Sequence, residues 1–570
     1  MLQFYAVQHP AEVAILMSDR QTGPDLQTPS VIVAGAGPTG LTMAAELIRH
    51  GVECRIVDAA PKPTDQSRAL VVHARTLEAF DNMGIADEAI ARGIKSPAAN
   101  IIADGRLLLR ISLAEIGSRY RFALMIPQSE TERIINGHLE ALGGTVERSV
   151  ELTGATQDNG GVVATLKHAD GRIEQARCDW LIGCDGAHSV VRHALGMAFE
   201  GVEYQTIFSL ADVHVDWSNA PDELFIYLAD NGLVAFFPIG GGRYRVVAET
   251  PIANTNPPTL GEFQTFVDGC APAGTRLHDP VWLERFRIHR RRVPNYRSGR
   301  IFLAGDAAHI HSPAGGQGMN TGIQDAYNLA WKLALVVAGG APESILDSYQ
   351  DERHAVSTMV LRNTDRMTKV GTIRGALGKT IRDYLIPLLG AIPPLAHALS
   401  NQMAGLTIEY SASSIVNADH LGLIGRVAAM LSASGPAAGS HAPDCEPIID
   451  SSGKSTWLAA AVRGTSHSLL IFEGMVTAVQ TSRMTEIAAA MSRRAGSRIR
   501  SFIIIANREG LSTAPDYNAE IIGDPALVAH RAYGAADPCL YLIRPDGYIG
   551  FRGSIDNSSG LIEYLGRIFT

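Results

Sequence analysis

The segment from Ser30 to Asp58 constrains the fold most strongly, because it has the pattern of strand, glycine turn, helix and second strand. The strand VIVA runs into Gly35-x-Gly37-x-x-Gly40, an apolar helical segment follows, and the strand CRIVD ends at Asp58. In such a unit the first glycine makes the turn, the second lets a pyrophosphate approach, and the third lets helix and strand pack. Asp58 is then placed to accept hydrogen bonds from ribose hydroxyls. The pattern predicts a dinucleotide-binding α/β domain and leaves FAD and NAD open.

A second constraint is the stretch from Arg300 to Lys332, where an apolar strand ends at Gly305-Asp306. A loop rich in proline and glycine follows, and a long helix is predicted to begin near Met319. The first N–H groups of a helix have no helical partner and suit an anion, or a carbonyl that gains negative charge. The carboxylate after the strand can accept hydrogen bonds from polyol hydroxyls. Together these features indicate a holder for a flavin.

The sequence GDAAH, a proline, and GGxGMNxGxxDAxNLxWKL resembles the second FAD-contacting motif of the flavin-dependent aromatic hydroxylases (class A flavoprotein monooxygenases). This family includes enzymes that act on aromatic polyketides. The resemblance implies that Asp306 holds the ribityl chain and that Pro313 lies beside flavin carbon 4a. It also implies that the N–H groups of Gly318, Met319 and Asn320 face the N1/O2 edge of the flavin.

Other parts of the chain resemble further motifs of this family. The segment Cys178–Gly196 resembles its Asp-Gly motif, so Asp185 is expected to bond the FAD, with a helix cap as the alternative. Gln128 matches a glutamine that contacts FAD. Arg68 and Arg75 are candidates for the pyrophosphate or nicotinamide region, with a surface ion pair as the alternative. The predicted cofactor-binding residues are Gly35, Gly37, Pro38, Thr39, Gly40, Asp58, Arg68, Arg75, Gln128, Asp185, Gly305, Asp306, Pro313, Gly316, Gly318, Met319 and Asn320.

The resemblance implies a reaction in which NADPH or NADH reduces FAD and O2 adds to the flavin as a carbon-4a hydroperoxide. A phenolic or polycyclic aromatic ring then receives the oxygen. Because a phenol reacts better as its phenolate, a base or an activating hydrogen bond is expected. The candidates, beside Pro313 at carbon 4a, are His73, His311, Tyr227 and Arg245, and no spacing rule selects among them.

Two other functions stay open. The same flavin chemistry could serve epoxidation, Baeyer–Villiger insertion or dehalogenating oxygenation. The chain could instead be a flavin-binding interaction scaffold with little turnover.

The predicted fold class is α/β, with a Rossmann-like FAD domain, an inserted β-sheet substrate domain and a C-terminal thioredoxin-like domain. Five aromatic residues in the inserted sheet could line a cavity over the flavin, although a core position is favoured for each: Tyr204, Tyr227, Phe236, Phe237 and Tyr244. The predicted boundaries are 1–28 for an N-terminal tail, 29–95, 126–198 and 293–375 for the FAD domain, 96–125 and 199–292 for the substrate domain, 376–440 for a helical segment and linker, and 441–570 for the thioredoxin-like domain.

Composition narrows the remaining classes. The net charge of −9 over 570 residues argues against nucleic acid as a general partner. No apolar run is long enough to cross a bilayer, and no secretory signal is recognisable at the N-terminus. Six cysteines without Cys-x-x-Cys spacing predict a reducing, cytoplasmic location, with neither a metal site nor dithiol chemistry in the C-terminal domain. The oligomeric state stays open, with a homodimer among the options.

Overall fold

A computed structural model of the protein describes most of the chain after the first 28 residues. The described residues are 29–64, 67, 69–229, 232–250, 256–312, 315–371, 386–387, 392–416, 435–475, 481–506 and 519–570. The predicted tail and the predicted site residues Arg68 and Pro313 lie outside these ranges.

A six-stranded sheet is the centre of the first half of the chain. Five of its strands, β1, β2, β8, β12 and β19, run parallel, and the edge strand β18 is antiparallel to β19. In sheet order they are β18 (Arg297–Ser298), β19 (Ile301–Leu303), β12 (Trp180–Gly183), β1 (Val31–Ala34), β2 (Cys54–Asp58) and β8 (Val146–Arg148). Helix α1 (Pro38–Arg49) joins β1 to β2, so the predicted βαβ unit is confirmed. Because parallel strands end at one edge of the sheet, the motifs after β1, β2, β12 and β19 meet there.

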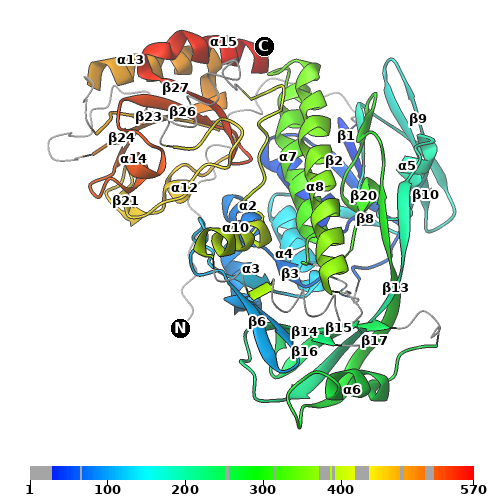
Figure 1. The fold of residues 1–570 in the computed structure, drawn as a ribbon. Helices are drawn as coiled ribbons and strands as arrows, with labels where there is room; N and C mark the ends of the chain where they lie inside the picture. The colour runs from blue at the N-terminus through cyan, green and yellow to red at the C-terminus, as the bar shows by residue number, and fades with distance from the viewer. Residues whose placement is uncertain are drawn as a thin grey trace, which may run out of the picture.

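Helix α7 (Gly318–Val337) lies against α1 and is buried on almost every side between Asn320 and Ala334. Figure 1 shows α7 and α8 (Asp347–Gly371) side by side in the middle of the molecule. Further helices described around this sheet are α2 (Ala74–Met83), α3 (Ala86–Arg92), α4 (Gln128–Ala141) and α5 (Val190–Ala194), and α10 (Pro393–Met403) follows α8 in the chain. A helix surrounded by protein positions its termini rigidly, and α7 begins at the edge where the motifs meet.

An eight-stranded sheet forms a second layer, with helix α6 (Leu260–Asp268) packed on its outer face (Figure 1). In sheet order its strands are β20 (His309–Ile310), β17 (Arg276–Arg292), β13 (Glu200–Asp216), β16 (Arg243–Thr250), β15 (Gly232–Gly240), β14 (Leu224–Ala229), β5 (Ala98–Ala103) and β6 (Arg106–Ser112). Two smaller sheets complete this half: β9 (Val150–Asp158), β10 (Gly161–His168) and β11 (Ile173–Cys178), and β3 (Val71–Val72), β7 (Ala123–Met125) and β4 (Ile94–Ser96).

The aromatic residues of the eight-stranded sheet do not share one face. Tyr227, Phe236 and Tyr244 pack in one cluster with Phe263 of α6, whereas Phe237 packs on the core of the opposite side. Side chains alternate between the faces of a strand, and α6 covers the face that holds the first three. The core position favoured for these three residues from the sequence is therefore confirmed. The side chain of Tyr204 lies outside the described residues.

The C-terminal region contains a seven-stranded sheet, β22-β21-β25-β24-β23-β26-β27, in which β23, β24 and β25 are parallel. The strands are β21 (Ile448–Ile449), β22 (Ser455–Thr456), β23 (His467–Phe472), β24 (Ile499–Ile505), β25 (Glu520–Gly523), β26 (Cys539–Ile543) and β27 (Ile549–Ser554). The helices are α12 (Leu458–Ala461), α13 (Thr481–Ala495), α14 (Val528–Ala532) and α15 (Ser558–Ile568). Strands β26 and β27 form an antiparallel hairpin that turns at Pro545-Asp546-Gly547, and this turn packs against α2, α7 and α8.

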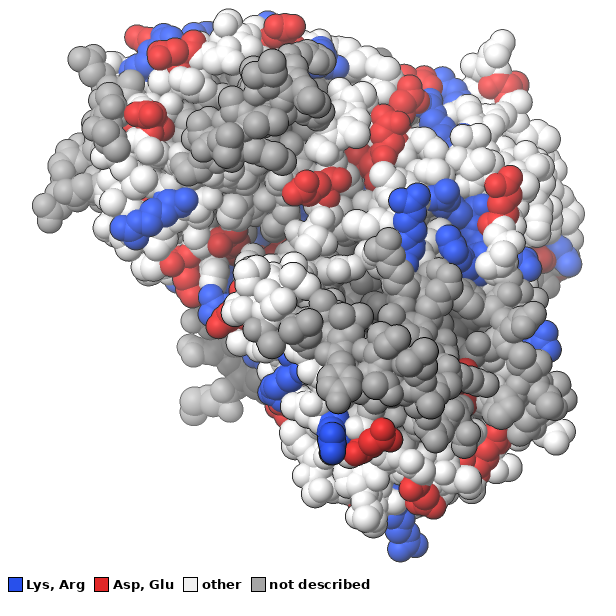
Figure 2. Space-filling model, viewed as in Figure 1, with Lys and Arg blue, Asp and Glu red and all other residues white. Residues whose placement is uncertain are grey.

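Figure 2 shows acidic and basic side chains lying near one another over much of the face it presents. No helix among the described residues is both long and apolar enough to cross a membrane.

Candidate active site

The turn after β1 combines two crowded glycines with an open one. A Cβ on Gly35, whose φ is +97°, would lie 2.4 Å from the carbonyl oxygen of Cys184, and one on Gly40 would lie 1.9 Å from that of Gly35. A Cβ on Gly37 would meet no described heavy atom within 4 Å. The turn is thus packed tightly from behind and open in front. That arrangement fits the approach of a pyrophosphate to the start of α1.

Two other parts of the predicted nucleotide site border this turn. Asp58, at the end of β2, accepts hydrogen bonds from the N–H groups of Ala36 (2.6 Å) and Ala60 (2.7 Å), so its carboxylate fixes the glycine turn. Pro38 occupies the first position of α1, where a missing N–H costs nothing. Thr39 follows it and contacts the second motif.

The second motif presents a single carboxylate from a buried turn. After β19 the chain forms a 3-10 turn, Gly305–Ala307, and Asp306 is exposed although every other residue from Ile301 to His309 is buried. A Cβ on Gly305 would lie 2.6 Å from the Thr39 hydroxyl, and one on Gly322 would lie 2.3 Å from it. The two glycine motifs therefore touch each other through Thr39, and Asp306 stands at their common edge.

Helix α7 begins at this edge with unpaired donors. Its first helical hydrogen bond runs from the N–H of Thr321 to the carbonyl of Gln317 (2.9 Å), so Gly318, Met319 and Asn320 supply the free N–H groups of the first turn. The side chain of the N-cap residue Gln317 makes no capping hydrogen bond among the described residues, and the first turn holds no acidic residue. Dipole and donors together favour negative charge there, as the N1/O2 edge of a reduced flavin requires.

The glycine loop before α7 is held from behind by two side chains. The Asn320 amide accepts a hydrogen bond from the His73 N–H (2.9 Å) and donates to the carbonyls of Val71 and Gly316, both at 2.8 Å. The His73 ring donates through Nε2 to the Gly315 carbonyl (2.9 Å), and burial lowers the pKa of His73 to about 4. His73 is thus neutral and committed to the loop, a contact that no spacing in the sequence indicates.

His311 borders the start of α7. Its Nδ1 donates to the Ser312 carbonyl (2.9 Å), its Nε2 has no hydrogen-bond partner among the described residues, and its ring lies 3.8 Å from the Cβ position of Gly318. Burial lowers the pKa of His311 to about 4. It is the sequence-predicted base with a ring nitrogen left over.

The Asp-Gly motif after β12 lies against the first glycine turn. One oxygen of Asp185 accepts hydrogen bonds from the N–H groups of Val190 (2.7 Å) and Val191 (3.1 Å), which is the predicted alternative of a helix cap. The other oxygen is buried with no partner among the described residues, so it is available to a donor on a cofactor. Arg192, which sequence reasoning left without a role, donates to the Ala307 carbonyl (3.0 Å) and links this motif to the Asp306 turn.

Behind the Asp306 turn lies a fully buried carboxylate, Asp325 of α7. It accepts hydrogen bonds from the Gly305 N–H (3.1 Å) and His309 Nε2 (2.7 Å) through one oxygen, and from Arg353 Nε (2.7 Å) through the other. Neighbouring positive charge, chiefly that of Arg353, keeps the pKa of Asp325 below its ordinary value despite burial. Sequence analysis missed Asp325 as a functional residue, although it stands at the Asp position of GMNxGxxDA.

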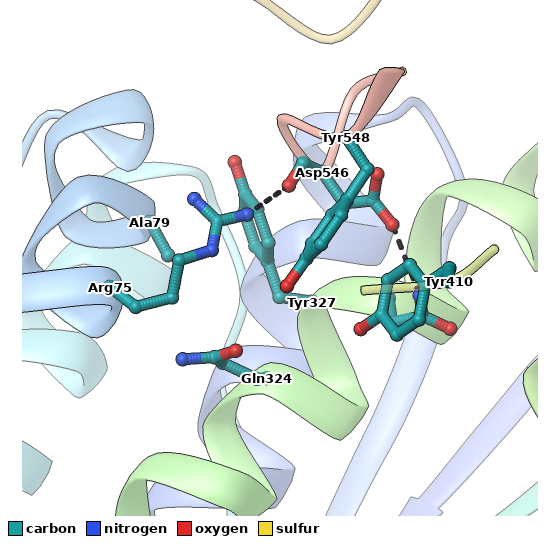
Figure 3. A pocket seen from close by; sticks show the side chains of 8 residues that line it. Arg75, Ala79, Gln324, Tyr327, Tyr410, Asp546 and Tyr548 are labelled. Carbon is teal, nitrogen blue, oxygen red and sulfur yellow. Dashed lines mark hydrogen bonds between the residues drawn. The ribbon is translucent and has the colours of Figure 1, made fainter. Parts of the chain in front are cut away.

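Two predicted cofactor contacts have other partners. The buried guanidinium of Arg75 donates to Glu78 (3.0 Å) and to the Asp546 carbonyl, and lies 4.9 Å from the centre of the Tyr548 ring. Figure 3 shows Arg75 beside Asp546 and Tyr548. Arg75 therefore joins α2 to the C-terminal hairpin, and its hydrogen bonds to Glu78 and Asp546 satisfy the buried positive charge. The Gln128 side chain accepts from the Ala69 N–H (3.1 Å) and donates to Glu132, so it holds the preceding loop.

Two predicted substrate-activating residues also have fixed roles. The Tyr227 hydroxyl accepts a hydrogen bond from Asn219 (2.6 Å) on the side of the sheet that meets α6. Arg245 is buried and forms a two-pronged ion pair with Asp212, at 2.8 Å for both contacts. Tyr227 therefore lies on the face of the sheet that α6 covers.

Comparisons with known proteins agree with this geometry. Residues 28–364 match the family model described as FAD binding domain. The chain is 34% identical over 555 residues to 6-methylpretetramide 4-monooxygenase of Streptomyces rimosus, covering 95% of this chain and 94% of that protein. It is 31% identical over 550 residues to pentachlorophenol 4-monooxygenase of Sphingobium chlorophenolicum, covering 94% and 96%. Among solved structures, OxyS anhydrotetracycline hydroxylase from Streptomyces rimosus matches with a TM-score of 0.72 and 28% identity, covering 95% of this chain and 99% of that one.

Proposed function

We propose that this chain, which belongs to the family of FAD-dependent aromatic hydroxylases, uses NADPH or NADH and O2 to hydroxylate a phenolic, fused-ring aromatic substrate. The family makes the protein a flavin-dependent monooxygenase. The nicotinamide nucleotide, O2 and the substrate class belong to the proposal. Support for a fused-ring substrate comes from relatives named for 6-methylpretetramide and anhydrotetracycline, which match nearly the whole chain.

One observation supports the proposal most: the two glycine motifs meet through Thr39 at an edge that carries both the Asp306 carboxylate and the uncapped start of α7. In the proposed site the open turn at Gly37 receives the pyrophosphate. Asp306 holds the ribityl hydroxyls, and the second oxygen of Asp185 accepts a further hydrogen bond from the cofactor. FAD held there and reduced by the nicotinamide nucleotide would activate O2, so that one oxygen atom enters the aromatic ring and the other leaves as water.

The residues around this edge prepare the site in three ways. The N–H groups of Gly318, Met319 and Asn320 offer fixed donors where negative charge develops, without reorganisation at the moment of reaction. His73 and the Asn320 side chain keep the glycine loop in place. His311, whose Nε2 has no hydrogen-bond partner among the described residues, is our candidate for accepting an activating hydrogen bond from the phenol hydroxyl, and Pro313 remains a predicted neighbour of carbon 4a.

The C-terminal domain has a separate proposed role. Its parallel strands β23, β24 and β25 with the antiparallel hairpin β26–β27 support a thioredoxin-like fold. Because the sequence contains no Cys-x-x-Cys, we assign this domain to packing against the FAD domain rather than to dithiol chemistry.

The experiment is a screen for NADPH or NADH oxidation that is stimulated by aromatic compounds, with the mass of each product measured. We expect one or more fused-ring phenols to accelerate the oxidation and to gain one oxygen atom. Replacement of a halogen by hydroxyl, or insertion of oxygen beside a ketone, would move the assignment to the alternative oxygenations. Absence of stimulated oxidation with every compound, in a flavin-loaded protein, would contradict the hydroxylase function.

A further inference from the structure

The interface between helices α7 and α8 and the C-terminal hairpin contains a balanced set of buried charges. It comprises three acids and three bases, Asp325, Glu352, Asp546, Lys332, Arg353 and Arg544, whose side chains are at most 2% exposed. Buried ion pairs add little net stability compared with apolar packing, but leaving one member unpaired is costly. Such a set therefore favours the one arrangement of the three elements in which every charge is paired.

The hairpin enters this set through Arg544 and Asp546. The Arg544 guanidinium makes two hydrogen bonds to the Glu352 carboxylate, at 2.6 and 2.8 Å, and also pairs with Asp546. Glu352 in addition accepts hydrogen bonds from Lys332 of α7 (2.8 Å) and Ser413 (2.6 Å). Side chains of the hairpin thus bond α8 at Glu352, the same residue through which α8 pairs with Lys332 of α7.

The next residue of α8, Arg353, connects α8 to the turn at Gly305-Asp306 through Asp325. Its Nε donates to Asp325, whose other oxygen accepts from the Gly305 N–H in the turn that presents Asp306. Its Nη1 donates to the Tyr410 hydroxyl (2.8 Å), and the Tyr410 ring lies 4.2 Å from that of Tyr548 in the hairpin. Figure 3 shows Tyr410, Tyr548 and Asp546 grouped beside α7.

We propose that Arg544 and Asp546 are positioning residues for the cofactor turn, acting through Glu352 and Arg353 of α8 and Asp325 of α7. The C-terminal domain then sets FAD affinity although it lies outside the FAD binding domain match at residues 28–364. This inference rests on the proposed function, because it takes the turn at Gly305-Asp306 as the holder of the ribityl chain.

The test is a charge-balanced double variant of the full chain, Arg544→Met with Asp546→Asn. It removes one base and one acid, and it leaves Glu352 paired with Lys332, Asn328 and Ser413. FAD is titrated into the apoprotein while flavin fluorescence is recorded, and the visible spectrum of the bound flavin and the melting temperature are measured in parallel. We expect the Kd for FAD to rise by about tenfold, a usual size for coupling between sites, with a changed flavin band.

The matched control is Arg463→Gln. Arg463 joins the same C-terminal domain to α2 by an ion pair with Asp81 (2.6 Å), but among the described residues it makes no hydrogen bond or ion pair to α8 or to the cofactor turn. We expect this variant to bind FAD with the wild-type Kd. A weakened Kd here would show that any disturbance of the interface has the same effect, and would overturn the specific route through α8.

Each remaining outcome is also decisive. If the double variant melts at a lower temperature but keeps the wild-type Kd and flavin spectrum, Arg544 and Asp546 are structural only and the inference is wrong. If the double variant does not fold, Arg544→Lys keeps the charge but loses the two-pronged geometry, and an unchanged Kd in that variant overturns the inference. A wild-type protein that binds no FAD refutes the proposed function itself, which separates the two failures.

Discussion

The start and the middle of helix α7 differ in whether their polar groups have hydrogen-bond partners within the protein. At the start, the first N–H groups are uncapped and the neighbouring Asp306 is exposed. In the middle, Asp325, Asn328 and Lys332 are buried, and each makes hydrogen bonds to neighbouring elements. Unpaired donors are costly when they are buried, so a protein keeps them where a ligand will pair them. The same helix thus presents uncapped N–H groups at its start and is held in place by side-chain hydrogen bonds at its middle.

The largest expected effect follows from removing the support in the middle. Asp325→Ala leaves Arg353, His309 and the Gly305 N–H without their common acceptor, and we expect a loss of about 3–5 kcal/mol in unfolding free energy, the usual cost of breaking a buried pair. Denaturant unfolding measures this loss. The control is Asp87→Ala, which removes an exposed carboxylate from the first turn of α3 and should change stability by at most about 1 kcal/mol. Equal unfolding free energies of Asp325→Ala and Asp87→Ala would contradict the role of Asp325 in holding the middle of α7.

A smaller effect is expected when pH changes the protonation of His73, which holds the loop before α7, and so changes the free energy of unfolding. Burial lowers the pKa of His73 from 6.5 to about 4, so between these values the unfolded chain binds a proton that the folded chain refuses. Stability must therefore fall as pH decreases from 6.5 to 4, by a His73 contribution on the order of 3 kcal/mol. Because His311 titrates in the same range, the measurement is the wild-type unfolding free energy minus that of His73→Asn. This difference should shrink on acidification, and a difference independent of pH would contradict the buried, neutral His73.

The smallest effect concerns the start of α7 itself. Gln317→Asp adds a negative charge beside the uncapped N–H groups, and we expect the apoprotein to gain about 0.3–1 kcal/mol in stability. The same charge competes with an anionic reduced flavin, so the midpoint potential of the bound flavin should become more negative. Gln317→Asn is the neutral control. A gain in stability with an unchanged potential would mean that the helix start does not face the flavin.

The local motifs could be predicted from the sequence, because a strand, a glycine turn and a helix are adjacent in the chain. The glycine turn after β1, the Asp306 turn after β19 and the start of α7 within one residue all follow from such patterns. Parallel pairing then brings them to one edge without further information. The roles assigned to individual side chains at this edge remain predictions.

What could not be predicted depends on contacts between distant segments. Arg75 pairs with a carbonyl 471 residues away, and the partner of Glu352 lies 192 residues away, so no local spacing reveals either contact. The alternation of side chains along β14 shows that Tyr227 has a fixed face, but not that α6 covers that face. Asp325 was overlooked because a buried acid within a helix has no signature of its own until its partners are known.

The most direct test of the flavin site is the FAD content of Asp306→Ala, compared with that of wild type and of Asp87→Ala. It is measured as the ratio of flavin absorbance to protein after identical purification. We predict a yellow wild type and control with close to one FAD per chain, and a clearly lower ratio for Asp306→Ala. Full occupancy in Asp306→Ala, or a wild type that stays colourless when supplied with FAD, would contradict the assignment of this edge as the flavin site.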